Sequence, residues 1–188
     1  NSYSNFNQDL SNEFEVKGET HIPNVGLRYE GDKLRTGFNV GLLNTTLRTE
    51  NLIQNIEFNN DFNNLFASAN FRYEFERSKR ISLYYRNSNN IPSIQQLQPV
   101  SIQTDPLNII EGNPNLKPSF NQNINLSFNN FDFKSRSGYG MYMSYNYVQD
   151  QVVSVTFTDE NLLRTTTYDN ISGGQNAYLN FYYSKQLK

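Results

Sequence analysis

Apolar and polar residues alternate with a period of two along most of this chain, and the three-to-four-residue spacing of an amphipathic helix is hard to find. The clearest run lies at residues 65–76, where the apolar positions are Leu65, Ala67, Ala69, Phe71, Tyr73 and Phe75. A period of two places successive side chains on opposite faces of a strand. The pattern therefore predicts an all-β protein whose strands have one apolar and one polar face.

The alternating runs and the turn residues between them predict an antiparallel up-and-down meander of about eight strands. The predicted strands cover residues 25–30, 34–49, 65–76, 81–86, 123–128, 139–157, a Thr-rich run that ends near Tyr168, and 177–184. Tight turns are predicted at residues 31–33, 77–80, 134–138 and 172–175. Two other connections, residues 50–63 and 88–118, are predicted to be long loops.

The segment 88–118 is predicted to be a structured loop because it holds five prolines, which lack the N–H that a strand ladder needs. The segment 50–63 is rich in Asn and shows no clear period. Short turns at one end of a sheet and long loops at the other are typical of outer-membrane barrels. The connections thus favour a segment of such a barrel.

Alternation alone does not decide whether the apolar face meets lipid or packs in a core, since both arrangements give the same pattern. The runs from residues 34 and 139 exceed the usual length of soluble strands, which favours a barrel. Aromatic residues near the strand ends are candidates for interfacial girdles, namely Tyr29, Phe75, Tyr84, Tyr85 and Tyr147. From these residues alone, a membrane barrel and a soluble extracytoplasmic β-domain that binds a ligand or protein partner both stay open.

Charge and composition exclude several kinds of function. The 16 basic and 18 acidic residues are spread along the chain, so no basic stripe suited to nucleic acid is present. The chain has no cysteine and a single histidine, His21, so thiol chemistry and His-based metal clusters are excluded. No P-loop, GxSxG, GxGxxG or HExxH motif occurs. The sequence therefore predicts no enzyme activity, no cofactor and no metal site.

Four residues are candidates for ligand binding. Tyr84, Tyr85 and Arg86 lead into the loop 88–118 and could stack on and hydrogen-bond a sugar or peptide. The simpler interpretation assigns the tyrosines to a girdle and the arginine to the lumen. Asn113, in the Gly-Asn-Pro step of that loop, could likewise bind a ligand, although turn chemistry explains it as well.

The stretch from Arg80 to Pro118 resembles a known family. It contains Ile91-Pro92-Ser93-Ile94-Gln95-Gln96-Leu97-Gln98-Pro99 and then Glu111-Gly112-Asn113-Pro114-Asn115-Leu116-Lys117-Pro118. This order of motifs resembles the late barrel strands of TonB-dependent receptors, especially the outer-membrane β-barrel proteins of Bacteroidetes. The resemblance implies a cell outer-membrane location and a part in binding or taking up a nutrient too large for a porin. It also implies contact with the lipid bilayer and, through the full-length protein, with TonB and a surface lipoprotein.

The chain departs from that family in its organisation. Receptors of this type are several times longer and carry a plug domain, which is not visible here, and the chain ends in Gln186-Leu187-Lys188 instead of an aromatic residue. We therefore expect residues 1–188 to be a single segment of a larger barrel. An isolated segment has open edge strands, so pairing between copies is expected as well.

Overall fold

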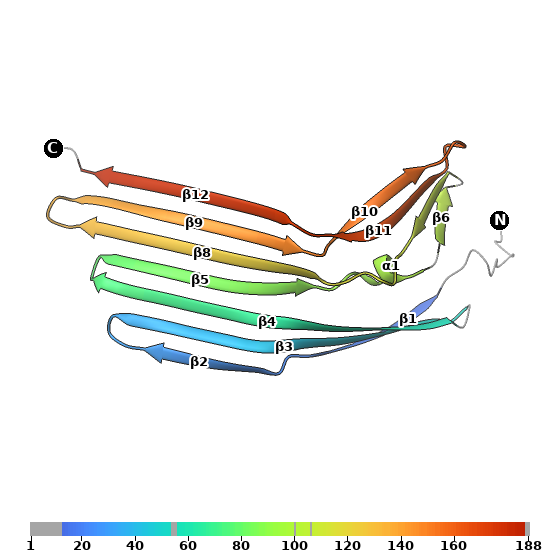
Figure 1. Ribbon diagram of the computed structural model, residues 1–188, viewed down its shortest axis with the longest axis horizontal. Helices are drawn as coiled ribbons and strands as arrows, with labels where there is room; N and C mark the ends of the chain where they lie inside the picture. Colours follow the sequence, from blue (N-terminus) through green and yellow to red (C-terminus); the bar gives the residue numbers. More distant parts are fainter. Residues whose placement is uncertain (1–12, 54–55, 100, 106, 187–188) are drawn as a thin grey trace, which may run out of the picture.

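A broad antiparallel sheet dominates the computed structural model, which describes residues 13–53, 56–99, 101–105 and 107–186 (Figure 1). Its neighbours follow the order β1-β3-β4-β5-β8-β9-β12, and β2 also pairs with β3. The strands are β1 (Phe14–His21), β2 (Asn24–Glu30), β3 (Leu34–Asn51), β4 (Ile56–Glu76), β5 (Lys79–Asn90), β8 (Ser119–Asp132), β9 (Ser137–Gln149) and β12 (Gly174–Lys185). The predicted all-β, up-and-down meander of about eight strands is confirmed.

β1 and β2 form one edge of this sheet. β1 pairs with the second half of β3 and β2 with its first half, in the same register. Between them, the amide of Leu42 on β3 donates a hydrogen bond to the carbonyl of Pro23 at 3.1 Å. Proline has no N–H to return, so the ladder is interrupted there. The sequence predicted only the β2 half of this edge.

The two ends of the sheet differ in their connections. One end, the short-turn end, holds the tight turns at residues 31–33, 77–78 and 133–136. The other, the long-loop end, holds α1 (Ile94–Leu97), β6 (Ser101–Asp105) and β7 (Asn108–Glu111) between β5 and β8, and β10 (Gln151–Thr158) and β11 (Arg164–Ile171) between β9 and β12. These four strands form a second sheet in the order β10-β11-β7-β6, which rises from the main sheet in Figure 1.

Two sequence predictions about these connections are wrong. Residues 50–63 are not a long loop, because β3 runs to Asn51 and β4 starts at Ile56. A continuous strand over residues 139–157 is also wrong, since the chain breaks at Asp150, whose φ is 52°, and β10 then joins the second sheet. The segment 88–118 is structured, as predicted, but it contains α1, β6 and β7.

The missed start of β4 has a physical cause, which is a change of face along the strand. From Leu65 to Phe75 the odd-numbered positions are all apolar. Earlier in the strand, Phe58 and Phe62 are even-numbered and therefore point to the opposite face, and Phe66 lies where the two patterns meet. β4 has 21 residues and a length of about 66 Å, enough to pass through two environments. A sequence pattern that requires the apolar residues to stay on one face along the whole strand therefore misses the first part of β4.

The small buried core lies at the long-loop end. Phe62 of β4, which is 8% exposed, packs with Leu97 and Leu116. These two leucines are 2% and 3% exposed and belong to the segment that connects β5 with β8, here called the connecting segment. Leu47, Ile91, Val152 and Tyr168 pack around them. Beyond this cluster, the main sheet has little apolar burial of its own in the described part of the chain.

The two sequence motifs of the connecting segment contact each other in this region. The amide of Asn113 donates to the carbonyl of Gln96 at 2.7 Å. A Cβ atom on Gly112 would lie 2.2 Å from the carbonyl oxygen of Gln98, so only glycine permits this approach. The two motifs that carry the family resemblance therefore contact each other and together place Leu97 and Leu116 in the buried core beside Phe62.

Candidate functional site

The main sheet has one apolar face, which we define by the odd-numbered residues of β2, β4, β5, β9 and β12 and the even-numbered residues of β3 and β8. Cross-strand pairs keep these positions together, for example in the row Phe71, Leu83, Leu126, Met143 and Leu179. Many of these side chains are exposed, including Leu27 at 70% and Phe181 at 68%. Phe71, Leu126 and Phe181 do not belong to the buried core.

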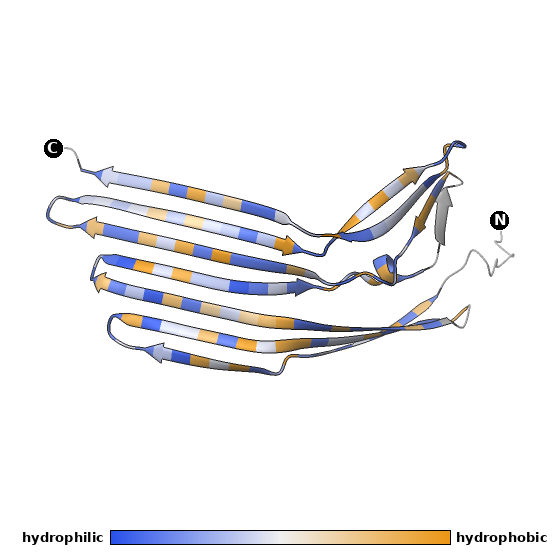
Figure 2. Cartoon of the chain, viewed as in Figure 1, coloured by the Kyte–Doolittle hydropathy of each residue, from blue (hydrophilic) through white to orange (hydrophobic). Residues whose placement is uncertain are grey.

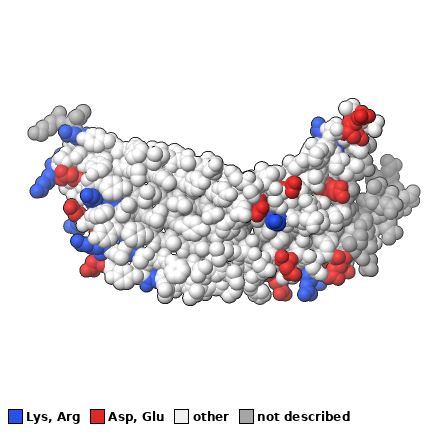
Figure 3. All heavy atoms as spheres, viewed as in Figure 1, with Lys and Arg blue, Asp and Glu red and all other residues white. Residues whose placement is uncertain are grey.

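Charge is absent from the middle of this face. Between Leu65 and Phe75 of β4, for example, all six side chains on the apolar face are uncharged. Figure 2 shows apolar and polar residues alternating along the long strands, and in Figure 3 the charged side chains gather at the two ends of the visible face. The Leu65–Phe75 stretch is about 33 Å long. At the usual strand tilt it rises about 25 Å, the height of the apolar band of a membrane barrel.

Tyrosines border the apolar band at both ends. Tyr29, Tyr73, Tyr139 and Tyr183 lie toward the short-turn end, and Tyr85, Tyr145 and Tyr147 lie toward the long-loop end. Amphipathic rings are enriched at membrane–water interfaces. Tyr84 does not belong to this girdle, because its position in β5 places it on the opposite face. Its assignment to the girdle is therefore wrong.

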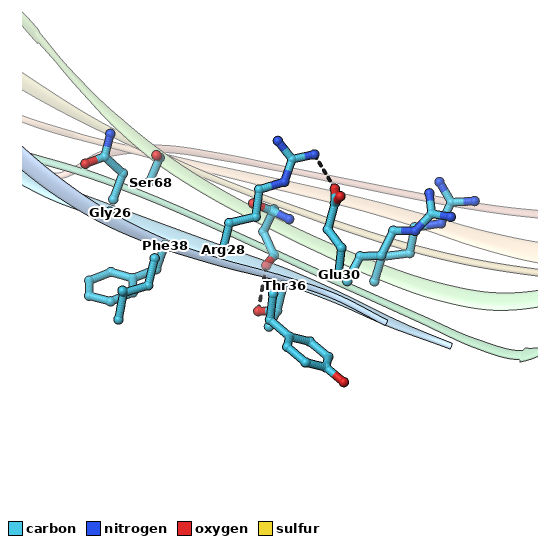
Figure 4. Close-up of a pocket in the computed structure, with 13 residues that line it drawn as sticks. Gly26, Arg28, Glu30, Thr36, Phe38 and Ser68 are labelled. Carbon is cyan, nitrogen blue, oxygen red and sulfur yellow. Dashed lines mark hydrogen bonds and ion pairs between the residues drawn. The ribbon is translucent and has the colours of Figure 1, made fainter. Parts of the chain in front are cut away.

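The opposite face of the sheet, the polar face, contains a hollow of about 520 Å³ across β2, β3 and β4. Its lining includes three arginines, Arg28, Arg35 and Arg72. Figure 4 shows Arg28 and Glu30 projecting on one side of the sheet and Phe38 on the other. We call the group Arg28, Arg35, Arg72, Asn39, Asn70 and Ser68 the arginine hollow.

The register fixes the arrangement of the hollow. Arg35 lies directly opposite Arg72, and Gly37 lies opposite both Arg28 and Asn70. Glu30 forms an ion pair with Arg28 within β2, and Glu74 forms one with Arg72 at 2.8 Å within β4. Within the described residues, Arg35 has no ion-pair partner.

Two polar atoms of the hollow are buried without a hydrogen-bond partner, namely Nε of Arg72 and Oδ1 of Asn39. A buried donor or acceptor that lacks a partner costs stability. Both atoms lie among side chains that line the hollow, so a bound ligand or water could satisfy them.

The polar face changes character along the sheet. On β8, β9 and β12 it carries Asn, Ser, Gly, Tyr, one Val and, at the short-turn end, Phe131, with no charged side chain among the described residues. The hydroxyl of Tyr142 donates to Oδ1 of Asn125 at 2.8 Å, and that of Tyr182 donates to Oδ1 of Asn129 at 2.6 Å. This half is a neutral wall of amides and phenols beside the arginine hollow.

The four residues singled out from the sequence do not form one cluster. Tyr84 and Arg86 lie on the polar face, directly opposite Asn70 and Ser68 of the arginine hollow. Tyr85 lies on the apolar face, where its hydroxyl is 3.4 Å from Oε1 of Gln122. Asn113 lies in the long loop, where its side chain donates to the carbonyl of Tyr168 at 3.0 Å and accepts from the amide of Asn115 at 2.9 Å.

Sequence reasoning missed the arginine hollow, although its members were visible as polar positions of separate strands. Arg28, Arg35 and Arg72 become neighbours only through the β2–β3–β4 register. The signal that could have found them is the summed charge of one face across adjacent strands. No group of three or more potential metal ligands occurs in the described part of the chain. No helix of that part is long and apolar enough to cross a membrane.

Comparison with known proteins decides which environments the two faces meet. A family model described as outer membrane protein beta-barrel family matches residues 1–188. The chain belongs to this outer-membrane β-barrel family. It is therefore located in the cell outer membrane, where the apolar face contacts the lipid bilayer and the polar face lines the barrel interior. The soluble-domain alternative required the aromatic residues to pack in a core, and it is not supported.

A solved structure shares the fold. The siderophore receptor PirA from Pseudomonas aeruginosa matches with a TM-score of 0.58 and 11% sequence identity, over 92% of this chain and 40% of that receptor chain. The present chain thus spans less than half of the receptor that it resembles in structure. No curated protein sequence matches the chain.

Proposed function

We propose that this chain forms part of the wall of a TonB-dependent-receptor-like barrel, which binds and takes up a nutrient at the cell surface. The observation that carries the proposal is the two-faced sheet. Its outward band is free of charge, while its inward face carries arginines and uncharged amides and phenols. Such a wall can replace part of the hydration shell of a polar solute.

The strands make the wall suitable for selective binding. At the level of the arginine hollow, the strands β3, β4, β5, β8 and β9 each pair with a neighbour on both sides, which holds their polar side chains in place. Rigid elements place binding groups more reproducibly than loops do. We assign the wall binding and passage of a solute, and no covalent step, cofactor or metal.

The proposal extends to partners of the complete protein. TonB supplies energy to receptors of the class that the sequence resembles, and a surface lipoprotein is the second partner that the resemblance implies. The structural likeness to a siderophore receptor supports the receptor class, and the 11% identity leaves the solute to experiment.

A growth competition tests this proposal. Cells that carry the complete protein, cells that lack it and cells that lack TonB are grown together, with carbon, iron, nitrogen or phosphorus limiting in turn. The proposal predicts that loss of the protein and loss of TonB reduce growth on the same limiting source. Equal growth of the first two strains on every source would contradict it.

A further inference from the structure

We propose that the arginine hollow binds a solute that carries carboxylate or phosphate groups. This inference rests on the proposed function, because it requires the polar face to be reached by water-soluble ligands. It names the charge class of ligand that the wall accepts. Nothing in the fold alone requires arginines at these positions.

The charge of the polar face is the first argument. On β2 to β5, this face carries Arg28, Arg35, Arg72, Arg80 and Arg86 against three carboxylates, Glu30, Glu74 and Glu76, the last of which lies at the bulge that ends β4. All eight positions lie within the span that the apolar band covers on the outer side, or at its short-turn border. Clustered like charges beside low-dielectric walls create a potential that concentrates counter-ions. The excess of arginine therefore selects anions.

The pairing of Arg35 with Arg72 is the second argument. Like charges directly opposite each other on neighbouring strands are destabilising. Glu74 forms its ion pair with Arg72. Glu30 lies directly opposite Arg35 on the other side but forms its ion pair with Arg28, so Arg35 has no ion pair among the described residues. An anion between the two guanidinium groups would offset this repulsion. It would also provide an acceptor for the unpartnered Nε of Arg72.

Space for a ligand is the third argument. Gly26 and Gly37 line the hollow and add no side chain of their own to it, so its volume of about 520 Å³ stays open between the polar groups. The side chain of Asn70 lies over Gly37, since a Cβ on that glycine would be 2.9 Å from Oδ1 of Asn70, and a larger residue there would displace this amide. The planar, multi-donor fork of arginine matches the geometry of carboxylate and phosphate oxygens. Room, donors and charge thus coincide at one place on the wall.

Thiol chemistry on the complete protein in outer-membrane vesicles tests the inference. The chain has no cysteine, so Ser68→Cys places a thiol at the hollow, and Ser144→Cys places one on the neutral wall. Each variant reacts with an anionic sulfonatoethyl methanethiosulfonate and with its cationic trimethylammonium counterpart. Pyrophosphate, tricarballylate and the neutral sugar maltose serve as competitors. Heat-modifiable migration checks that each variant is folded.

We expect the ratio of the reaction rates of the anionic and the cationic reagent to be about tenfold higher at Ser68→Cys than at Ser144→Cys. Adding Arg35→Gln should remove most of that gain. Pyrophosphate or tricarballylate should slow the reaction of Ser68→Cys severalfold, whereas maltose should not. Protection by one anion and not the other would distinguish phosphate from carboxylate as the group recognised.

The remaining outcomes separate this inference from the proposed function. If neither cysteine reacts with the water-soluble reagents, the polar face does not line an aqueous path, and the proposed function fails. If Ser144→Cys reacts and Ser68→Cys does not, or if both react without charge preference, only the anion site is overturned. A charge preference without protection by either anion also overturns the site, since the field then acts without binding.

Discussion

The side chain of Asn87 takes the place of a strand neighbour for Ala67. Oδ1 of Asn87 accepts a hydrogen bond from the amide of Ala67 at 2.7 Å, and its Nδ2 donates to the carbonyl of Leu65 at 3.0 Å. The β4–β5 ladder ends just before this point, at the pair Ser68 and Arg86. Asn87 thus satisfies two backbone groups where the strands separate, and its own side chain is fully buried.

Replacing Asn87 should destabilise the protein strongly. Asn87→Leu leaves the amide of Ala67 without its partner and takes a donor from the carbonyl of Leu65, so we expect a loss of about 2–4 kcal/mol in the free energy of unfolding. Asn63→Leu, at an exposed position of β4, is the matched control and should change it by less than about 0.5 kcal/mol. Denaturant titration of the refolded protein measures both. Equal effects would show that the Asn87 hydrogen bonds are not needed.

The ring of Tyr182 lies across Gly140 on the neighbouring strand. A Cβ on Gly140 would come within 2.5 Å of that ring, whose hydroxyl donates to Asn129. Gly140→Ala should therefore displace the ring and cost about 1–3 kcal/mol. A double-mutant cycle with Tyr182→Ser should show that most of this cost disappears when the ring is absent.

Gly174→Ala is the control for the glycine experiment. A Cβ there would meet its nearest neighbours at 3.5 Å, an ordinary contact, so we expect little change in unfolding free energy. If Gly140→Ala proved as harmless as Gly174→Ala, the packing of Tyr182 on the glycine would play no part in stability.

The regular middle of the sheet could be predicted from sequence because one rule governs it. Each residue there faces either lipid or water, so the alternation of Leu65 to Phe75 gives strand, face and approximate ends together. The same rule failed where the outer environment changed. Beyond Leu42 and Leu65 the outward side chains become polar, as at Arg48 and Asp61, because they leave the apolar band.

The candidate site could be predicted only in part, because most of its residues become neighbours through strand pairing. Arg86 and Tyr84 could be identified because they precede the proline-rich loop, but Arg28, Arg35 and Arg72 carry no local motif. They come together only when the register of three strands is known. Tyr85 was grouped with Tyr84 because they are adjacent in sequence, yet adjacent residues of a strand face opposite sides.

The tight turn after β8 should respond to acid. Hydrogen bonds from the hydroxyl of Ser135 and the amide of Lys134 lower the pKa of Asp132, which lies beyond the apolar band, below its usual value of 3.8. Because this pKa is lower in the folded chain than in the unfolded one, the carboxylate stabilises the turn above its unfolded pKa. That stabilisation disappears as the pH falls through the folded pKa.

Ser135→Ala should raise the pKa of Asp132 toward 3.8, since the largest cause of its shift is removed. A carboxyl carbon NMR titration in micelles measures this value, with Asp132→Asn to assign the signal. Ser78→Ala, in the neighbouring tight turn, should leave the pKa of Asp132 unchanged. A pKa that does not move in the Ser135 variant would show that the hydroxyl does not hold the carboxylate.

A charge should be tolerated on one face of β8 and not on the other. Leu126 lies between Leu83 and Met143 in the apolar band, so Leu126→Arg should cost about 2–4 kcal/mol in a lipid bilayer. Ser127→Arg points the same charge to the polar face and should cost about 1 kcal/mol or less. Unfolding titrations in vesicles measure the difference. Similar costs at both positions would show that the two faces meet the same medium.

The most direct test of the two-faced wall is a spin-label scan along β3. Single cysteines are placed from Thr36 to Glu50 in the complete protein in bilayers, and label relaxation by oxygen and by a water-soluble nickel chelate is compared at each site. We predict that oxygen dominates at even positions as far as Leu42 and that, from Asn44 onward, the even positions become accessible to the nickel chelate. Oxygen-accessible labels that continue at the even positions to Glu50, or labels without a period of two, would contradict the account.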